Sequence, residues 1–526
     1  MSEGAAKKEE KPRKFQAIRG TRDLLPPDTS LWNRVEQTAH EIFMTFGFGE
    51  IRLPIFEQTE LFARSIGAET DVVSKEMYTF GEQDLSRLNS IHHALSSRLS
   101  EGSYLSIIPW FEAFVREVEF AIKEDHIPQP LPNGVTIEEL RKFLASCMDY
   151  ANRPINELEE NEKERQIGLI RAYLQLLETE KLFTLRPEAT ASVCRAYIEH
   201  GMQSLPQPVK LYYMGPMFRR ERPQKGRYRQ FYQIGAEVLG GSDAPAIDAE
   251  VIEMVMMFFD RLELQGVQLD LNSIGCRECR PRYIELLRAE LLKVKDKLGP
   301  DSQRRIETNP LRVLDSKLES EQRIITTLPR IADHLCEECK AHYAAVKHQL
   351  EIRGVIYREN WRLVRGLDYY MRTTFEITAQ GLGSQNAVCG GGRYDGLVEL
   401  LGGPPTKGIG FAIGEDRLIL SLQESGKAPA QQGRDVYIAW MGERAHATAI
   451  RAAKDLRKAG FSVELPPVEQ KFGKALGQAD KLGAKYALIL GDNEVSEGLW
   501  TLKTLADGSQ AKYTEPDLLE HLRKSL

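Results

Sequence analysis

Long apolar runs are missing from this sequence. Its 526 residues include no uninterrupted apolar stretch of 18 residues, the length that a membrane-spanning helix needs. The N-terminal MSEGAAKKEEKPRK also lacks the apolar core of an export signal. We therefore predict no membrane association, a disordered arm over residues 1–14 and a cytoplasmic location.

No sign of charge dominates the chain. It holds 70 Lys and Arg residues against 76 Asp and Glu residues, which gives a formal net charge of -6 at pH 7. Proteins that coat nucleic acid without specificity are basic overall, so this balance argues against that class. A local basic site remains compatible with it.

Cysteine is scarce, with 7 residues, and a cytoplasmic chain of this size does not depend on disulfides. Four of the seven form two matched pairs, Cys276 with Cys279 and Cys336 with Cys339. Two such pairs can complete a tetrahedral zinc site, although the 56 residues between them exceed a compact zinc ribbon. We predict a structural zinc, with reduced thiols that hold no metal as the alternative. The remaining cysteines have no such partners and are expected to be small buried side chains: Cys147, Cys194 and Cys389.

Against this even background, positive charge gathers in FRRERPQKGRYR, residues 218–229, where six of twelve residues are cationic. Strand-like alternation follows and places Gln233 and Glu237 on one face, joined by the small Gly235. Residues 209–218 predict a second strand, so the arginines would stand on a hairpin and face phosphate or carboxylate oxygens. The alternative is a charged hairpin exposed to solvent.

The chain length allows about two to four domains. Amphipathic patterns over residues 83–181 predict a folded helical insertion rather than disorder. Residues 275–359 are mostly helical in pattern and include the paired cysteines. A polar linker over 426–433 precedes alternating strands and helices over 434–526, which predict a separate α/β domain.

Strand patterns resume between these helical regions. Strands are predicted over residues 361–379, WRLVRGLDYYMRTTFEITA, and over the glycine-rich residues 387–398, AVCGGGRYDGLV. KGIGFAIGEDRLILSLQES, residues 407–425, predicts a strand that passes through glycines into a helix.

Several of these segments carry a family resemblance. They are GTRDLLP (20–26), TLRPEATAS (184–192), GPMFRRERPQKGRYRQFYQIGAEV (215–238), LVRGLDYYMRTTFE (363–376), VCGGGRYDGL (388–397), GIGFAIGEDRL (408–418) and the C-terminal α/β domain. Together they resemble the histidyl-tRNA synthetases, which are class II aminoacyl-tRNA synthetases. RGLDYY and GGGRYDGL resemble the histidine-specific motifs of that family.

The resemblance implies an α+β fold. A class II catalytic domain over 15–425 would hold an antiparallel six-stranded sheet with helices and helical insertions, and 434–526 would bind the anticodon. The chain would work as a homodimer.

The resemblance also implies a reaction in two steps. L-Histidine and ATP, supplied as its Mg complex, would give histidyl-adenylate, and the histidyl group would then pass to the 3' end of tRNA(His). The runner-up function is a catalytically inactive, synthetase-like regulatory subunit of histidine biosynthesis. A sensor of uncharged tRNA is a further alternative, but it would need partner domains that this chain lacks.

Catalysis at phosphorus requires cations held against the phosphates. By resemblance, Arg219 contacts the α-phosphate, Arg227 reaches the γ-phosphate, and Arg417 stacks on adenine. Arg365 is the second cation at the α-phosphate and the histidine carboxylate, so Arg365 and Arg219 are the predicted catalytic residues.

Selection of histidine requires side chains that recognise its ammonium group and its imidazole ring. The family's histidine-binding positions correspond to Arg365 and six further residues. Those six are Glu188, Thr190, Gln233, Glu237, Tyr369 and Tyr370. Carboxylates at such positions can pair with the ammonium group and accept from the imidazole N–H.

The chain departs from the family pattern in three places. Ala189 stands where the family usually has glycine, Arg220 follows Arg219, and the insertion over 83–181 replaces a short turn. The insertion could contact the tRNA acceptor arm, form an interface or be a neutral surface domain.

Overall fold

The computed structural model describes residues 15–67, 70, 72–80, 182–367, 369–382, 386–426 and 433–525, with the single positions 138 and 142. The predicted N-terminal arm, nearly all of the predicted insertion over 83–181, the core of the predicted linker and Cys147 lie outside these residues. None of the described helices is both long and apolar enough to cross a membrane.

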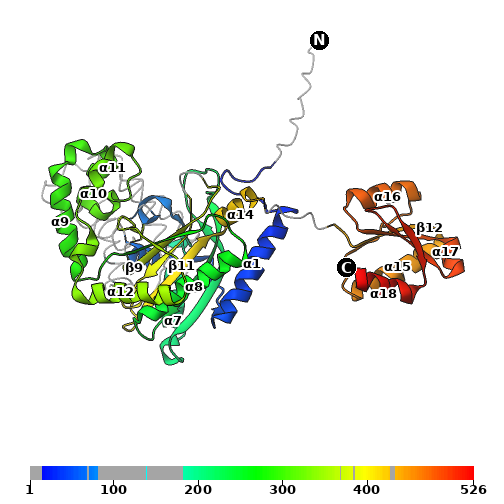
Figure 1. The fold of residues 1–526 in the computed structure, drawn as a ribbon, viewed down its shortest axis with the longest axis horizontal. Coiled ribbons are helices and arrows are strands. Elements are labelled where there is room, and N and C mark those ends of the chain that lie inside the picture. The colour runs from blue at the N-terminus through cyan, green and yellow to red at the C-terminus, as the bar shows by residue number, and fades with distance from the viewer. Residues whose placement is uncertain are drawn as a thin grey trace, which may run out of the picture. The chain divides into compact units, whose positions relative to one another are not determined.

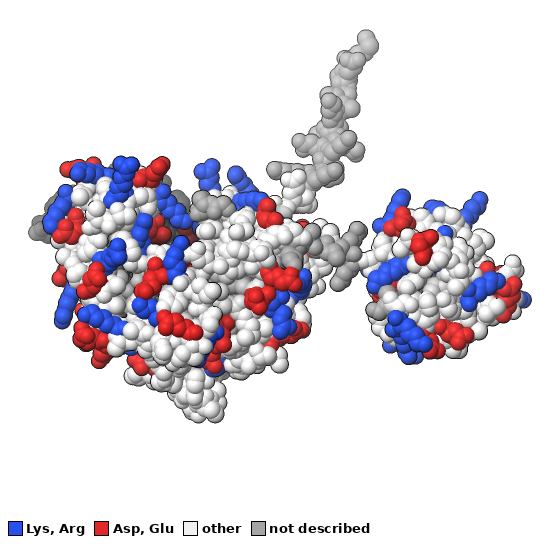
Figure 2. All heavy atoms as spheres, viewed as in Figure 1, with Lys and Arg blue, Asp and Glu red and all other residues white. Residues whose placement is uncertain are grey.

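The chain divides into two compact units. The larger one comprises Glu36–Ser425 with the segment up to Arg22, and the smaller one comprises Gly426–Leu526 with Asp23–Val35. Lys and Arg side chains are interspersed with Asp and Glu side chains on the visible face of both units (Figure 2), as the even charge balance implies.

The helices described before residue 426 are α1 (Asp28–Thr45), α2 (Thr59–Ile66), α7 (Thr190–Glu199), α8 (Pro245–Arg261), α9 (Cys279–Lys293), α10 (Pro300–Thr308), α11 (Glu319–Ile325), α12 (Glu337–Ile352), α13 (Leu397–Leu400) and α14 (Glu415–Glu424). The strands are β1 (Gly49–Glu50), β2 (Phe56–Gln58), β3 (Tyr78–Phe80), β4 (Phe183–Leu185), β5 (Val209–Phe218), β6 (Gln230–Leu239), β7 (Gln268–Ser273), β8 (Arg358–Glu359), β9 (Met371–Thr378), β10 (Ala387–Arg393) and β11 (Gly408–Gly414).

An eight-stranded sheet forms the centre of the larger unit (Figure 1), in the order β1-β5-β6-β11-β10-β9-β7-β8. Its six inner strands are antiparallel to one another, as in the predicted class II sheet. The two-residue strands β1 and β8 extend this sheet at its edges and run parallel to their neighbours. A separate three-stranded sheet has the order β2-β4-β3.

The predicted hairpin is formed by β5 and β6. Its apolar positions on β6, Ile234, Ala236 and Val238, are at most 2% exposed. On the covered side of the sheet, the ring of Phe43 from α1 lies 5.9 Å from that of Phe258 in α8 and 5.9 Å from that of Phe411 in β11. Burial of each such side chain stabilises the fold by about 1.5–3 kcal/mol. The opposite side of β6 therefore remains for the polar residues.

One strand prediction is wrong in its first half. The strand pattern over 361–379 begins as a strand only at Met371, and the preceding residues form turns and extended loop. The side-chain amide of Asn272 on β7 donates to the carbonyl oxygens of Trp361, at 3.2 Å, and Leu363, at 2.9 Å. These bonds hold the chain away from ladder pairing until β9 begins.

Helices α9 to α12, with the 3-10 turn η8 (Pro310–Val313), fill the stretch between β7 and β8. They enclose a hydrophobic cluster whose central side chains include Tyr283, Leu287 and Ile306. This helical segment stands at one end of the sheet (Figure 1).

The smaller unit has a five-stranded sheet in the order β13-β12-β14-β15-β16. Its elements are β12 (Val436–Met441), α15 (Glu443–Lys458), β13 (Val463–Glu464), α16 (Phe472–Lys481), β14 (Tyr486–Gly491), α17 (Asp492–Glu497), β15 (Trp500–Thr504), β16 (Gln510–Tyr513) and α18 (Glu515–Ser525). Strands β12, β13 and β14 are parallel and β15 and β16 are antiparallel, so this is an α/β unit with an antiparallel edge.

Candidate active site

A cavity of about 820 Å³ opens on the polar side of β6. Nine of the ten side chains predicted to bind histidine or ATP line it: Glu188, Thr190, Arg219, Arg227, Gln233, Arg365, Tyr369, Tyr370 and Arg417. The tenth, Glu237, is 1% exposed and lies behind Thr190, whose hydroxyl donates to its carboxylate at 2.9 Å. The fold thus brings together residues that are more than two hundred positions apart in the chain.

Two buried carboxylates stand at one end of the cavity, Glu188 in its lining and Glu237 behind Thr190. Glu188 accepts hydrogen bonds from the backbone N–H groups of Thr190, at 2.8 Å, and Ala191, at 3.0 Å, at the start of α7. Burial raises the pKa of Glu188, and these bonds offset only part of the effect. Burial also raises the pKa of Glu237 to about 8, although Tyr394 and Thr190 donate to it. Both groups suit a cationic ligand, which would favour their charged forms.

Tyr369 and Tyr370 form an aromatic wall beside these carboxylates. Their ring centroids are 4.7 Å apart, and the ring of Tyr369 meets that of Tyr394 edge-on at 5.8 Å. The Tyr369 hydroxyl lies 3.5 Å from both Glu188 Oε2 and the Thr190 hydroxyl, which are long, weak contacts. A flat ring with polar edges would fit against such a wall.

Two of the arginines share one acidic neighbour. Arg219 follows β5, donates to the carbonyl oxygen of Pro187 at 2.9 Å and lies 3.8 Å from the Glu221 carboxylate. Arg227, on the β5–β6 connection, pairs with the same carboxylate at 3.1 Å. Glu221 therefore holds both guanidinium groups beside the cavity.

The other two arginines come from segments that follow the β5–β6 hairpin in the chain, Arg365 from the loop before β9 and Arg417 from α14. Arg365 pairs with Glu376 of β9 at 2.7 Å. Arg417 lies on α14, where burial, and then the charge of Arg227, lower its pKa. Four guanidinium groups thus line one cavity, an arrangement that suits the oxygens of a polyphosphate.

Some polar atoms at this cavity have no hydrogen-bond partner among the described residues. They are Gln233 Oε1, the Tyr213 hydroxyl and Arg365 Nε, each fully buried as an atom. Buried polar atoms are normally satisfied, so a ligand that reaches these groups would complete their bonding.

Four residues of this site are not predicted from the sequence. Tyr394 donates to Glu237 at 2.6 Å, while Tyr213, Glu221 and Glu376 line the cavity. Strand alternation could have indicated Tyr213, because it pairs directly with Gly235 across the hairpin. Glu221 and Glu376 lie inside motifs that the analysis quotes, but their spacing alone does not show which arginine each one meets.

The neighbours of Tyr394 have a structural role. Arg393 is 1% exposed and pairs with Asp248 of α8 and, at 2.9 Å, with Asp395. Neither Arg393 nor Asp395 is among the residues that line the cavity.

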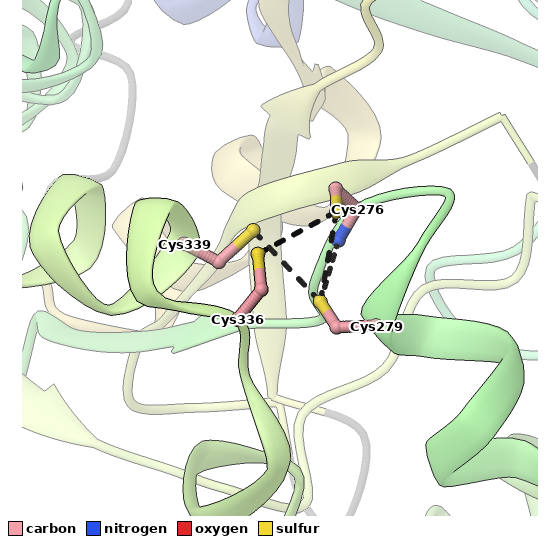
Figure 3. A group of neighbouring side chains, drawn as sticks. All are labelled: Cys276, Cys279, Cys336 and Cys339. Atoms are coloured by element: carbon pink, nitrogen blue, oxygen red, sulfur yellow. Dashed lines mark hydrogen bonds between the residues drawn. The ribbon is translucent and has the colours of Figure 1, made fainter.

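The four paired cysteines converge between α9 and α12 (Figure 3). Their sulfur atoms all lie within 4.8 Å of one another. The shortest separations are 3.7 Å for Cys276–Cys279, 3.8 Å for Cys276–Cys336 and 3.9 Å for Cys279–Cys339. Sulfurs around a tetrahedral zinc ion are about 3.8 Å apart, because Zn–S bonds are about 2.3 Å long. The cluster can therefore hold a metal ion.

The backbone around these thiols has the matching form. Gly275 has φ +72° and a Cβ there would lie 2.8 Å from Cys279 Sγ, so glycine permits the close approach. Burial opposes the thiolate of Cys276, but backbone N–H groups of Cys279 and Glu278 bond its sulfur and bring its pKa down to about 7. The other two cysteines that the structure describes, Cys194 and Cys389, are buried as predicted.

Comparisons with known proteins agree with this site. The family model described as Histidyl-tRNA synthetase matches residues 151–418, and one described as Anticodon binding domain matches residues 435–525. The histidine--tRNA ligase of Solibacter usitatus is 45% identical over 509 residues, covering 97% of this chain and 99% of that protein. The chain belongs to the histidyl-tRNA synthetase family.

Other histidyl-tRNA synthetases support the assignment. The histidine--tRNA ligase of Koribacter versatilis is 45% identical over 513 residues, covering 97% of this chain and 96% of that protein. The crystal structure of apo Staphylococcus aureus histidyl-tRNA synthetase aligns with a TM-score of 0.66 at 32% identity, covering 97% of this chain and all of that chain.

A third structure is more distant. It is described as an ATP phosphoribosyltransferase regulatory subunit/histidyl-tRNA synthetase from Bacillus halodurans and aligns with a TM-score of 0.52 at 16% identity, covering 89% of this chain and 97% of that chain. At that identity the likeness shows a shared fold alone, so it does not favour the regulatory alternative.

Proposed function

We propose that this histidyl-tRNA synthetase family member activates L-histidine with ATP and transfers the histidyl group to the 3' end of tRNA(His). The observation that carries the proposal is one cavity lined by four arginines, by Tyr369 and Tyr370 and by the buried Glu188. A regulatory subunit has no need for a complete phosphate-binding set beside the amino-acid site.

Histidine recognition falls to the buried end of the cavity. Glu188 and Glu237 would pair with the ammonium group, and Thr190 fixes the Glu237 carboxylate for this contact. Gln233, with its unsatisfied carbonyl oxygen, would accept from the imidazole N–H, and Tyr369 and Tyr370 would hold the ring. An amino acid without these donors would leave buried groups unpaired and would bind far more weakly.

Adenylate formation falls to the arginines. A carboxylate oxygen of histidine attacks the α-phosphorus, the bond to the bridging oxygen of the β-phosphate breaks, and pyrophosphate leaves. Arg365 and Arg219 would neutralise the α-phosphate and orient the carboxylate, Arg227 would contact the γ-phosphate, and Arg417 would stack on adenine. ATP arrives as its Mg complex, in which the metal neutralises phosphate charge.

Transfer to tRNA completes the reaction. The 3'-terminal adenosine hydroxyl attacks the histidyl carbonyl and AMP leaves. The smaller unit, whose residues 435–525 match the anticodon-binding family, would select tRNA(His). The catalytic region over 15–425, the binding domain over 434–526, a homodimeric assembly and a cytoplasmic location follow from the family resemblance.

We also propose that Cys276, Cys279, Cys336 and Cys339 hold one structural Zn²⁺. The sulfur separations support this, as does the all-thiolate donor set, which zinc prefers in closed structural sites. Zinc content of the purified chain, measured by plasma mass spectrometry, tests it, and a chain that never carries zinc would contradict it.

Histidine-dependent exchange between ATP and pyrophosphate tests the main proposal. The intact chain should exchange with histidine and with no other amino acid, and Arg365→Ala should lower the rate about 100-fold or more. Arg261→Ala, at the exposed end of α8, is the matched control and should keep the activity. A folded protein that binds histidine but gives no exchange would support the regulatory alternative instead.

A further inference from the structure

We propose that the four-cysteine site positions the histidine-binding segment over residues 365–370, so that metal occupancy sets the affinity for histidine. This inference rests on the proposed zinc site and on the proposed adenylation activity. Its physical basis is a set of contacts that join each cysteine pair to the chain beside Tyr370.

The first contact is a backbone pair next to Cys276. The backbone N–H of Arg372 donates to the carbonyl oxygen of Gly275 at 2.8 Å, and that of Ile274 donates to the carbonyl oxygen of Arg372 at 2.8 Å. Arg372 follows Tyr370 by two residues, and Gly275 directly precedes Cys276. These two bonds fix the end of the histidine-binding segment against the turn that carries Cys276.

The second contact depends on a strained residue. Arg372 has φ +49°, in the left-handed region that non-glycine residues rarely adopt. Such a conformation persists only where the surroundings hold it. The Arg372 guanidinium pairs with Asp243 at 2.9 Å and with Glu338, which lies between the two cysteines of the second pair, at 3.4 Å. A metal that fixes Cys336 and Cys339 would also fix the turn that carries Glu338, and would therefore help to hold Arg372 in its strained conformation.

The third contact runs from α9. Arg280 follows Cys279 and donates to the backbone carbonyl oxygen of Tyr370. A donor from a charged group makes a stronger bond than a neutral one. The orientation of α9 at its cysteine end thus sets the position of the Tyr370 backbone.

Packing leads to the same conclusion. Cys279, Cys339 and Tyr370 are buried in one hydrophobic cluster, with Cys276, Cys336 and Tyr369 packed against it. On another side, Val364, Arg365 and Leu367 border a separate cavity of about 300 Å³ between this segment and α9. Because that side is hollow, the segment depends on its contacts near the thiols for position.

The expected effect is selective for one substrate. Arg365, Tyr369 and Tyr370 belong to the segment that the thiol site supports, whereas Arg219 and Arg227 stand on the β5–β6 hairpin and Arg417 on α14. Loss of metal should therefore weaken the use of histidine much more than that of ATP.

The experiment uses the full chain and follows zinc content and pyrophosphate exchange together. The purified protein should carry about one zinc per chain. After removal of zinc with a mercurial and a chelator, the KM for histidine should rise about tenfold, the scale of one lost hydrogen bond from a charged donor, while the KM for ATP changes less than about twofold. Added zinc should restore the original value.

Two variants on α9 distinguish a loss of the contact to Tyr370 from a general effect on folding. Arg280→Met removes the contact to Tyr370 and should raise the KM for histidine about tenfold, with zinc content unchanged. Arg282→Met, two residues along and exposed to solvent, should change neither.

The outcomes distinguish the three claims. A chain without zinc overturns the metal site, and a chain without exchange at saturating histidine overturns the adenylation activity. If zinc is bound but neither its removal nor Arg280→Met alters the KM for histidine, the positioning role is wrong and the other two proposals stand.

Discussion

Tyr394 donates its hydroxyl proton to the carboxylate of Glu237 at 2.6 Å, and the two side chains are 2% and 1% exposed. Thr190 donates to the other oxygen of the same carboxylate at 2.9 Å. Glu237 is thus held by two neutral donors and by no cation among the described residues in contact with it. A bound ammonium group would supply the missing positive charge, which makes this trio the natural anchor for an amino acid.

Tyr394→Phe should weaken histidine use and spare ATP use. The change removes one donor from a buried carboxylate, which costs about 1–3 kcal/mol of binding when the ligand must compensate, or roughly a tenfold higher KM for histidine in pyrophosphate exchange. Tyr357→Phe is the matched control, because it deletes a tyrosine–glutamate bond to Glu351, of 3.1 Å, at the surface. Equal KM values for the two variants would remove Tyr394 from the site.

The pKa of Glu237 gives a second prediction, on stability. Its ordinary value of 4.5 is raised to about 8 in the folded chain, chiefly by burial. Between these values the native state keeps a proton that the unfolded chain has released, so this stabilising contribution is full below 4.5 and is lost as pH rises toward about 8. Relative to Glu237→Gln, the wild-type protein should lose at most about 1.4 kcal/mol per pH unit across that window.

Thermal unfolding of the two proteins at several pH values, without ligand, measures this difference. Other buried carboxyl groups cancel in the comparison because both proteins contain them. A difference that stays constant between pH 5 and pH 8 would show that Glu237 titrates normally.

Local sequence patterns were sufficient to predict the parts of the fold in which apolar residues or cysteines recur at a regular spacing. The alternation in residues 231–238 predicts β6 closely, and the apolar run over residues 209–218 predicts β5. The same alternation correctly places Gln233 and Glu237 on one side. Paired cysteines at matched spacing likewise predict a four-thiol cluster, which the structure contains.

Other features depend on contacts that no local pattern encodes. Residues 361–367 are largely apolar like a strand, yet they do not join the sheet, and Asn272, 89 and 91 positions earlier in the chain, holds the carbonyl oxygens of Trp361 and Leu363. Strand β7 is not predicted from the sequence, since QLDLNS is short and both its faces are buried. Tyr394 is not predicted as a site residue because its role depends on a hydrogen bond to Glu237, which lies 157 positions away.

Arg393→Met should destabilise the larger unit, and residue 393 does not line the substrate cavity. The guanidinium is buried and pairs with Asp248 and Asp395, so its removal leaves a buried carboxylate without its cation and should cost about 3–5 kcal/mol. Lys225→Met breaks the exposed pair with Glu424, of 2.8 Å, and should change the stability little because solvent screens such a pair. Thermal unfolding compares the two, and similar melting temperatures would contradict the structural role of Arg393.

Gly235 leaves room between Gln233 and Glu237, the two β6 side chains that we propose to bind histidine. It pairs with Tyr213 of β5, and the Tyr213 hydroxyl occupies the space between Gln233 and Glu237. A Cβ at position 235 would lie 2.3 Å from that hydroxyl and 2.7 Å from the carbonyl oxygen of Phe411. Because the Phe411 carbonyl is backbone of the neighbouring strand, a side-chain rotation alone cannot relieve the clash.

Gly235→Ala should therefore lower both stability and histidine use. Overpacking of this kind costs about 1–3 kcal/mol, and the backbone shift that relieves it displaces Gln233 and Glu237 together. Gly473→Ala on α16 is the control, because nothing lies within 4 Å of its added methyl group and alanine favours a helix over glycine by about 0.8–1.0 kcal/mol. Gly235→Ala should lower the melting temperature and Gly473→Ala should raise it. In pyrophosphate exchange, only Gly235→Ala should use histidine less well. If that variant kept its KM for histidine, the side chains on either side of Gly235 could not be the ones that read the substrate, because they cannot hold their positions while the strand between them moves.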